Sequence, residues 1–223
     1  MTLTRVSESD RGQAFPIYIM MVAGLLFLAL AFFAVGKASA TRNGAQGAAD
    51  AAALAAALEA RREMGPDFLA ALMVPHGLEE FFSSARSTGK SCVEAQRFAD
   101  KNRADLVSNG LDGPCAWSGG VFQDEVTVNV RTRYTVGESV LPGTSERHAT
   151  ASATARVEFL CSWELVANRV GSGKGSGEAS ASKDEPNLIE FTCEDRDKFT
   201  VDPLNPEPWG ELAEAFFAIH LID

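Results

Sequence analysis

Residues 14–35 form the uncharged stretch AFPIYIMMVAGLLFLALAFFAV. A helix rises ~1.5 Å per residue, so this stretch is about 33 Å long and can cross a hydrocarbon core of about 30 Å. Pro16 stands in the first helical turn, where an N–H group has no partner within the helix, so its absence costs little stability. Tyr18 lies near the expected membrane–water interface, where amphipathic aromatic rings are favoured. We predict a transmembrane helix over residues 14–36, preceded by an N-terminal segment over residues 1–13.

A cleaved signal peptide is the alternative interpretation of the same stretch. Ala38-Ser39-Ala40 fits the small-x-small pattern of a cleavage site, and basic residues precede the apolar run. The run is longer than the roughly 7–15 apolar residues of a signal peptide, which favours a retained anchor. The flanking charges do not decide the orientation, because Arg5 and Arg11 nearly balance Lys37 and Arg42. In both interpretations the rest of the chain leaves the cytoplasm.

A second helix signal follows directly. Residues 36–64 contain no proline, and strong helix formers dominate from Gln46 onward. The membrane helix is therefore expected to continue as a stalk helix over residues 37–65, with Gly65-Pro66 as the stop. Small residues recur at every fourth position, namely Gly36, Ala40, Gly44, Ala48, Ala52, Ala56 and Ala60. Such a stripe lets another helix approach closely, which predicts packing against partner helices, above all through Gly36 to Ala52.

Two motifs flank the apolar run: Arg11-Gly12-Gln13 before it, and TRNGAQGAADAAALAAA, residues 41–57, after it. Residues 10–62 thereby resemble the N-terminal segment of TadE/TadG-like proteins of the tight-adherence (Flp, type IVb) pilus assembly systems, most closely the TadG-related proteins of actinobacteria. The resemblance implies a prepilin-like anchor with a cytoplasmic N-terminus and an exported C-terminal domain. It also implies a role as a minor pseudopilin or assembly factor.

One position departs from the pattern of processed prepilins, which are cut after a glycine and carry a glutamate five residues into the mature chain. A cut after Gly12 makes Gln13 the first residue and Ile17 the fifth, so no carboxylate stands there. Three N-termini therefore stay open: the intact chain, a cut after Gly12, and a cut after Ala40.

The charge of the chain limits which partners it can have. A net charge of −10 argues against a nucleic-acid partner, because neutralising phosphates requires clustered Lys and Arg. After residue 42 the chain has 16 basic and 28 acidic residues, which suits a soluble exterior and argues against attraction to an anionic membrane.

All four cysteines follow the apolar run: Cys92, Cys115, Cys161 and Cys193. No C-x-x-C occurs and the three histidines stand apart in sequence, so zinc spacing is absent, and no metal or cofactor is predicted. An even number of cysteines outside the cytoplasm predicts two disulfides and places residues 43–223 on the outer side. Three connectivities are possible; we favour Cys92–Cys115 with Cys161–Cys193, which join neighbours in sequence.

The fold class predicted for residues 66–223 is a small extracytoplasmic α+β domain with an antiparallel sheet. Helices are expected over Leu78–Ala85 and from a capping box at Ser91–Glu94 through Leu106, with Cys115 in the loop that follows. A short helix over Trp209–Phe216 is expected before a terminal strand.

Alternation of apolar and polar residues predicts three strands, over residues 126–136, 149–161 and 189–193, the first two as an antiparallel hairpin. Many alanines on the second strand indicate that a bulky element, such as the stalk helix, packs closely there. The low-complexity residues 171–186 are predicted to form a disordered loop.

No catalytic motif is complete. The stretch Thr88-Gly89-Lys90-Ser91 lacks the first glycine of a phosphate loop, and His148 beside Glu146 is typical of a solvated loop. The acidic residues Glu194, Asp195, Asp197 and Asp202 lack EF-hand spacing. We therefore predict a non-catalytic, single-pass membrane protein whose partners are other pilin-like or Tad-system membrane subunits. A secreted or anchored extracytoplasmic binding module with a cleaved signal peptide is the alternative.

Overall fold

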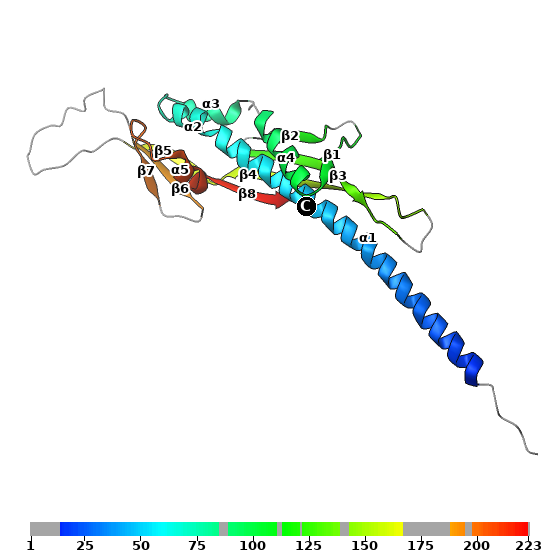
Figure 1. Cartoon of the computed structure of the whole chain (residues 1–223). Helices are drawn as coiled ribbons and strands as arrows, with labels where there is room; N and C mark the ends of the chain where they lie inside the picture. Colours follow the sequence, from blue (N-terminus) through cyan, green and yellow to red (C-terminus); the bar gives the residue numbers. More distant parts are fainter. Residues whose placement is uncertain are drawn as a thin grey trace, which may run out of the picture.

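The computed structural model describes residues 14–84, 89–110, 113–120, 122–138, 143–166, 188–194 and 198–222. One long helix leaves a head of helices and strands and extends well beyond it (Figure 1). The predicted fold class, an apolar N-terminal helix followed by an α+β domain with an antiparallel sheet, is confirmed. Residues 1–13 and the predicted loop over 171–186 lie outside the described residues.

The long helix α1 spans Ala14–Glu63 and runs through Lys37 without a break. It does not simply stop at Gly65-Pro66. Met64 joins it to a second helix, α2 (Gly65–Leu72), which has Pro66 in its first turn. A proline is tolerated in a first turn, where the N–H has no helical partner, and it prevents α1 from continuing unchanged.

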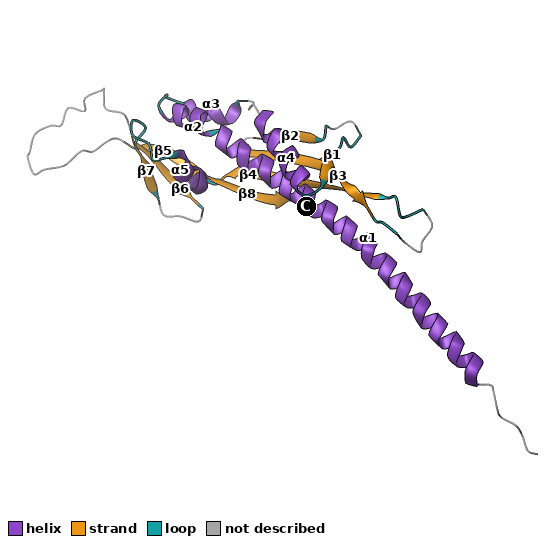
Figure 2. Ribbon diagram, in the orientation of Figure 1, coloured by secondary structure: helices purple, strands orange, loops and turns teal. Residues whose placement is uncertain are grey.

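The second half of α1 is embedded in the head rather than standing free as a stalk. It packs along α4 (Gly89–Lys101) and against strands β3 (Gln123–Thr135) and β4 (His148–Phe159). Its alanines are buried, namely Ala45, Ala48, Ala49, Ala52, Ala53, Ala56 and Ala57. Small side chains make this part of the helix narrow, and the alanines of β4 are equally small, so helix and sheet approach closely. The expected packing of the helix on the second strand is therefore observed (Figure 2).

Two helix boundaries differ from the predictions. The helix α3 (Gly77–Ser83) begins one residue before Leu78, and Ala85 lies outside the described residues. The helix α4 begins before Ser91, so Ser91 is a buried helical residue and not a cap.

The end of α4 also comes earlier than predicted, and Leu106 lies in a strand, β1 (Ala104–Leu106). The Asn102 amide donates to the Phe98 carbonyl at 2.9 Å, and Arg103 adopts a left-handed φ of 56°. Both features end a helix, because the amide competes for the backbone carbonyl and the next residue leaves helical geometry.

The main sheet is antiparallel and has the order β1-β3-β4-β8, with β2 (Cys115–Gly120) pairing a further part of β3. The predicted hairpin of β3 and β4 is present, with Val126 opposite Ala155 and Val130 opposite Ala151. The terminal strand β8 (Phe217–Ile222) pairs with β4. Cys115 is the first residue of β2, which corrects its assignment to a loop.

A smaller sheet has the order β5-β6-β7, formed by Cys161–Val166, Leu188–Cys193 and Phe199–Val201. The predicted strand over 149–161 is interrupted at Leu160, whose N–H donates to the Phe216 carbonyl at 2.9 Å. The chain changes sheets at this point. Helix α5 (Trp209–Phe216) precedes β8, as predicted.

Aromatic residues fill the core beyond the alanine layer. Phe68 of α2 is completely buried, and its ring centroid lies 5.2 Å from that of Phe216 and 5.4 Å from that of Phe81. The rings of Phe159 and Phe217 also pack against the Phe68 ring. The core thus joins α2 and α3 to the ends of β4, α5 and β8.

Candidate functional site

The N-terminal half of α1 is an apolar rod, which we define as residues 15–35, and it is exposed along its length except at the half-buried Ala31 and at Ala34, which is buried. Phe15, Met20, Phe27 and Phe32 each expose at least 70% of their surface. Within the described residues this is the one helix long and apolar enough to cross a membrane. So large a continuous apolar surface requires an apolar environment, and a bilayer provides one.

The stripe of small residues is divided between two environments. Gly36 and Ala40 are exposed between the apolar rod and the head. Ala48 and Ala52 are 1% and 0% exposed, because α4, β3 and β4 of the same chain cover the helix there. Their predicted contact with a partner helix is therefore wrong. The same contact through Gly36 and Ala40 stays a prediction.

Gly44, in the middle of the stripe, also meets its own chain. An ideal Cβ at this glycine would lie 2.0 Å from the Tyr134 hydroxyl oxygen, far inside van der Waals contact. The Tyr134 ring in turn lies under the Arg103 guanidinium, whose central carbon is 4.8 Å from the ring centroid. Because Gly44 has no side chain, Tyr134 of the β3–β4 hairpin can lie directly against the surface of α1.

Replacing Ala52 by leucine is expected to destabilise the head by about 1–3 kcal/mol, because three extra heavy atoms enter a filled layer. The matched variant Ala40→Leu places the same side chain on the exposed part of the same stripe and is expected to leave head stability unchanged. Chemical denaturation of both variants in detergent, followed by tryptophan fluorescence, checks this. Equal midpoints for the two variants would contradict the placement of α1 inside the head.

Lys37 fastens the hairpin to α1 at the end of the apolar rod. Its Nζ donates to the Glu138 carbonyl at 2.9 Å and lies 5.6 Å from the centroid of the Phe33 ring, one turn earlier. One turn later, the buried Thr41 hydroxyl donates to the Lys37 carbonyl at 3.1 Å. Lys37 and Gly44 thus mark two contacts between α1 and the hairpin, and the Thr41 hydrogen bond lies within the helix between them.

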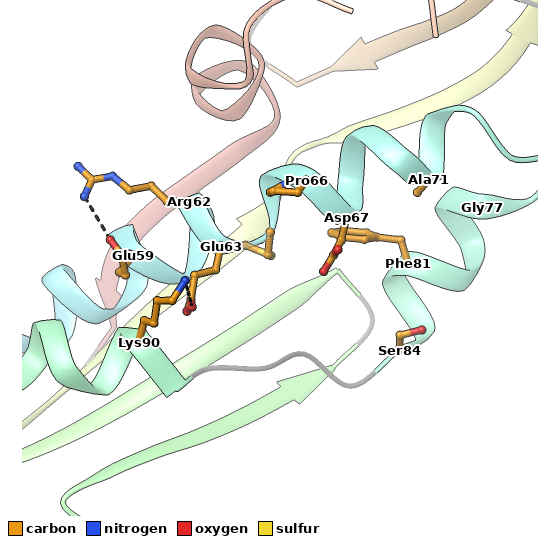
Figure 3. Close-up of a pocket in the computed structure, with 11 residues that line it drawn as sticks. Glu59, Arg62, Glu63, Pro66, Asp67, Ala71, Gly77, Phe81, Ser84 and Lys90 are labelled. Carbon is orange, nitrogen blue, oxygen red and sulfur yellow. Dashed lines mark hydrogen bonds and ion pairs between the residues drawn. The ribbon is translucent and has the colours of Figure 1, made fainter. Parts of the chain in front are cut away.

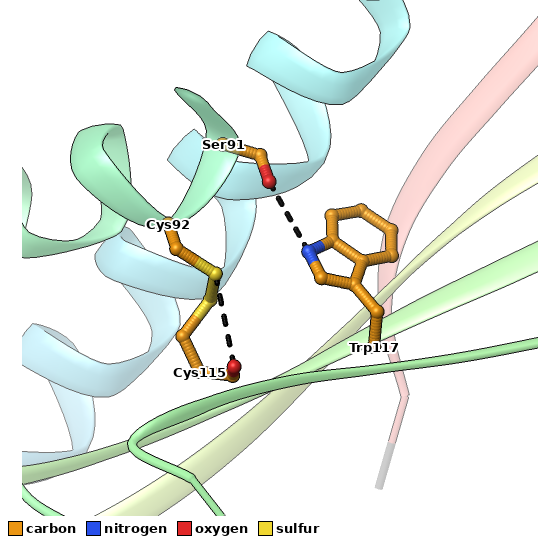
Figure 4. Close-up of a disulfide and its surroundings, with 4 residues drawn as sticks. All are labelled: Ser91, Cys92, Cys115 and Trp117. Atoms are coloured by element: carbon orange, nitrogen blue, oxygen red, sulfur yellow. Dashed lines mark hydrogen bonds between the residues drawn. A yellow bond between two sulfur atoms is a disulfide. The ribbon is translucent and has the colours of Figure 1, made fainter. Parts of the chain in front are cut away.

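Two disulfides are present in the head. Cys92 of α4 is joined to Cys115 of β2, with the Cα atoms 5.9 Å apart, so this bond ties the helical layer to the sheet (Figure 4). Beside it, the Trp117 indole N–H donates to the buried Ser91 hydroxyl at 3.1 Å. The second bond joins Cys161 to Cys193, which lie opposite each other on β5 and β6.

Replacing Cys161 and Cys193 together by serine is expected to lower the free energy of unfolding by about 2–4 kcal/mol, because the unfolded chain loses a cross-link. The bond closes a sequence separation of 32 residues. A lowered urea midpoint for the double variant, with a slope at least as steep because the unfolded chain is no longer cross-linked, checks this. Unfolding of the unaltered chain with and without reductant provides the comparison. A double variant as stable as the unaltered, oxidised chain would contradict the prediction.

A cavity of about 700 Å³ lies where α1, α2, α3 and the start of α4 meet (Figure 3). Glu63 points into it, with Oε1 3.8 Å from the Lys90 ammonium, while its buried Oε2 has no hydrogen-bond partner among the described residues. Glu59 pairs with Arg62 at 3.2 Å. Sequence patterns do not predict this cavity, since its lining comes from four helices.

Within the described residues no group of three or more His, Cys, Asp and Glu side chains is placed to hold a metal ion.

The residues considered for catalysis are not brought together. His148 Nδ1 lies 2.6 Å from the Thr132 carbonyl, on the main sheet. Asp202 accepts a hydrogen bond from the Leu204 N–H, and Asp195 and Asp197 lie outside the described residues.

The surface carboxylates with shifted acidity belong to ion pairs. A hydrogen bond from Arg133 lowers the pKa of Asp105, and one from Arg97 lowers the pKa of Glu94. Both shifts move the carboxyl pKa away from neutral pH, as expected for groups that stay ionised in a pair.

The fold and the uncovered rod define a class: proteins with one N-terminal apolar helix that can serve as a membrane anchor and an α+β head built on its continuation. Residues 12–61 match the model of a family described as putative Flp pilus-assembly TadE/G-like. The match covers α1 almost from end to end and confirms the resemblance to TadE/TadG-like proteins predicted over residues 10–62, without separating TadG-related proteins from the rest of the family. No curated protein and no solved structure matches the chain.

Proposed function

We propose that this chain is a membrane-anchored, pseudopilin-like subunit of a Tad (Flp, type IVb) pilus or of a related type II-like secretion apparatus, without a catalytic role. The family match over residues 12–61 carries the proposal, because it falls on the apolar rod and on the helix that the head encloses. A pilus-assembly role is what that family supports.

The proposed mechanism is mechanical. The apolar rod holds the subunit in the membrane until assembly, and the unbroken helix connects it rigidly to the head. The exposed Gly36 and Ala40 provide the place where a neighbouring helix can approach closely. The partners proposed are other pilin-like or Tad-system membrane subunits.

The proposed orientation places the N-terminus in the cytoplasm and the head outside. Two disulfides in the head support it, because disulfides persist in oxidising compartments and are rare in the cytosol. The cell membrane is accordingly the proposed location.

Cleavage after Ala40 would instead release the head as a secreted module. That cut would remove the apolar rod and Lys37, together with the contact to Glu138. N-terminal sequencing of the mature protein separates the two functions. A start at Thr41 supports the secreted module, whereas an intact N-terminus or a start at Gln13 supports the anchored subunit.

Deletion of the gene followed by complementation tests the assembly role. Cells that lack the chain are expected to lose surface pili or the secreted substrate of the apparatus, and the full-length chain is expected to restore them. The head alone, residues 41–223 behind a cleavable signal, is expected to fail. Normal piliation without the chain, or full rescue by the released head, would contradict the proposal.

A further inference from the structure

We propose that the end of the β3–β4 hairpin is a second contact between this protein and the bilayer, and that it lies in the phospholipid headgroup layer where α1 emerges. We call residues 136–138 and 143–147 the hairpin tip. The inference rests on the proposed membrane anchor, and it adds a surface of the head that the anchor alone does not imply.

The length of the apolar rod determines where the headgroups are. The 22 uncharged residues that end at Val35 measure about 33 Å, against a hydrocarbon core of about 30 Å, so the helix has little freedom to slide. The headgroup layer beyond the core is about 5–7 Å thick. Lys37 lies two residues beyond Val35, or about 3 Å along the axis, and therefore falls within that layer.

The Lys37 side chain points toward the bilayer and not away from it. Helix side chains tilt toward the N-terminus, and the Nζ accordingly lies 5.6 Å from the ring centroid of Phe33 in the apolar rod. The ammonium group is thus placed near the border between the hydrocarbon and the headgroups.

The hairpin tip reaches this same ammonium group. The Glu138 carbonyl oxygen is 2.9 Å from Nζ, and an ideal Cβ at Gly137 would be 3.6 Å from it. The two arms of the tip are still joined here, since the Gly137 N–H donates to the Ser145 carbonyl at 3.1 Å. Both arms are therefore brought to the headgroup level. Figure 1 shows the hairpin leaving the head on the same side as the apolar rod.

The contact is imposed by the anchor and does not need electrostatic attraction. In the tip, Glu138 and Glu146 oppose Arg147, and Lys37 balances the remaining charge. A nearly neutral, polar tip suits zwitterionic headgroups and agrees with the acidic character of the rest of the head. The contacts of Tyr134 with Gly44 and of Glu138 with Lys37 hold the hairpin against α1.

Depth-dependent fluorescence quenching tests the proposal. The native cysteines are all paired within the structure, so one added cysteine provides a single labelling site. Three full-length variants are labelled in phosphatidylcholine vesicles: Ser145→Cys in the tip, Leu204→Cys between β7 and α5, and Phe27→Cys in the apolar rod. Each is measured with a nitroxide on the lipid headgroup and with one deep in the acyl chain.

The label at Ser145 is expected to be quenched several-fold more by the headgroup nitroxide than the label at Leu204, and only weakly by the deep one. The label at Phe27 is expected to respond to the deep nitroxide. Equal, weak quenching at Ser145 and Leu204, with strong deep quenching at Phe27, would overturn the hairpin contact and leave the anchor intact. Loss of deep quenching at Phe27 would overturn the anchor, and the hairpin contact and the proposed function with it.

Discussion

Replacing Leu25 and Leu28 together by arginine is expected to abolish membrane integration of the chain. Both residues lie near the middle of the apolar rod and are exposed, at 62% and 53%, so no part of the described head shelters them. Each arginine at the centre of a transmembrane helix costs about 2.5–3.5 kcal/mol, and the pair therefore about 5–7 kcal/mol. That cost is more than a thousandfold change in partitioning.

Alkaline carbonate extraction of membranes measures this effect. The arginine variant is expected in the soluble fraction, and the variant with isoleucine at both positions in the membrane fraction with the unaltered chain. The folded head should be unaffected, because the rod makes no contact with it at these positions. An arginine variant that still resists extraction would show that something other than the rod holds the protein in the membrane.

Phe68→Ala is expected to destabilise the head by about 3–5 kcal/mol. The ring is completely buried and lies within 6.3 Å, centroid to centroid, of Phe81, Phe159, Phe216 and Phe217. Its removal leaves a cavity between α2, β4 and the C-terminal elements that rigid neighbours cannot fill. Total stabilities of domains are about 5–15 kcal/mol, so a large share is lost.

Thermal unfolding in detergent, followed by circular dichroism, checks this result. Phe32→Ala provides the matched control, since it removes the same ring from a position that is 75% exposed and lies outside the head. The control should leave the unfolding midpoint of the head unchanged. A Phe68 variant that unfolds with its control would contradict the placement of this ring in the aromatic core.

The elements predictable from sequence are those with a local signal. An uncharged run predicts the apolar rod, and alternation predicts β3, β4 and β6. The short strand β2 carries no such signal, because its sequence CAWSGG has two glycines and no alternation. The interruption at Leu160 also has no local cause, since it depends on a hydrogen bond to Phe216, 56 residues later.

The stripe of small residues shows why the site was only partly predictable. A helix face lined by alanine accepts any close neighbour, and its pattern does not distinguish a partner helix from the sheet of the same chain. The alanines of β4, such as Ala153 and Ala155, provide the complementary signal, and together the two patterns predict the contact that forms. The bond from Lys37 to Glu138 joins residues 101 positions apart and has no counterpart in local sequence.

The most direct test of the central claim asks whether one unbroken helix crosses the bilayer and presents an oxidised head on the outer side. A membrane-impermeant maleimide is applied to right-side-out spheroplasts that produce Leu204→Cys or Ser7→Cys. The predicted result is labelling of Leu204→Cys in intact spheroplasts, labelling of Ser7→Cys only after permeabilisation, and no reaction of the four native cysteines before reduction. Labelling of Leu204→Cys only after permeabilisation, or free native thiols in the isolated protein, would contradict the claim.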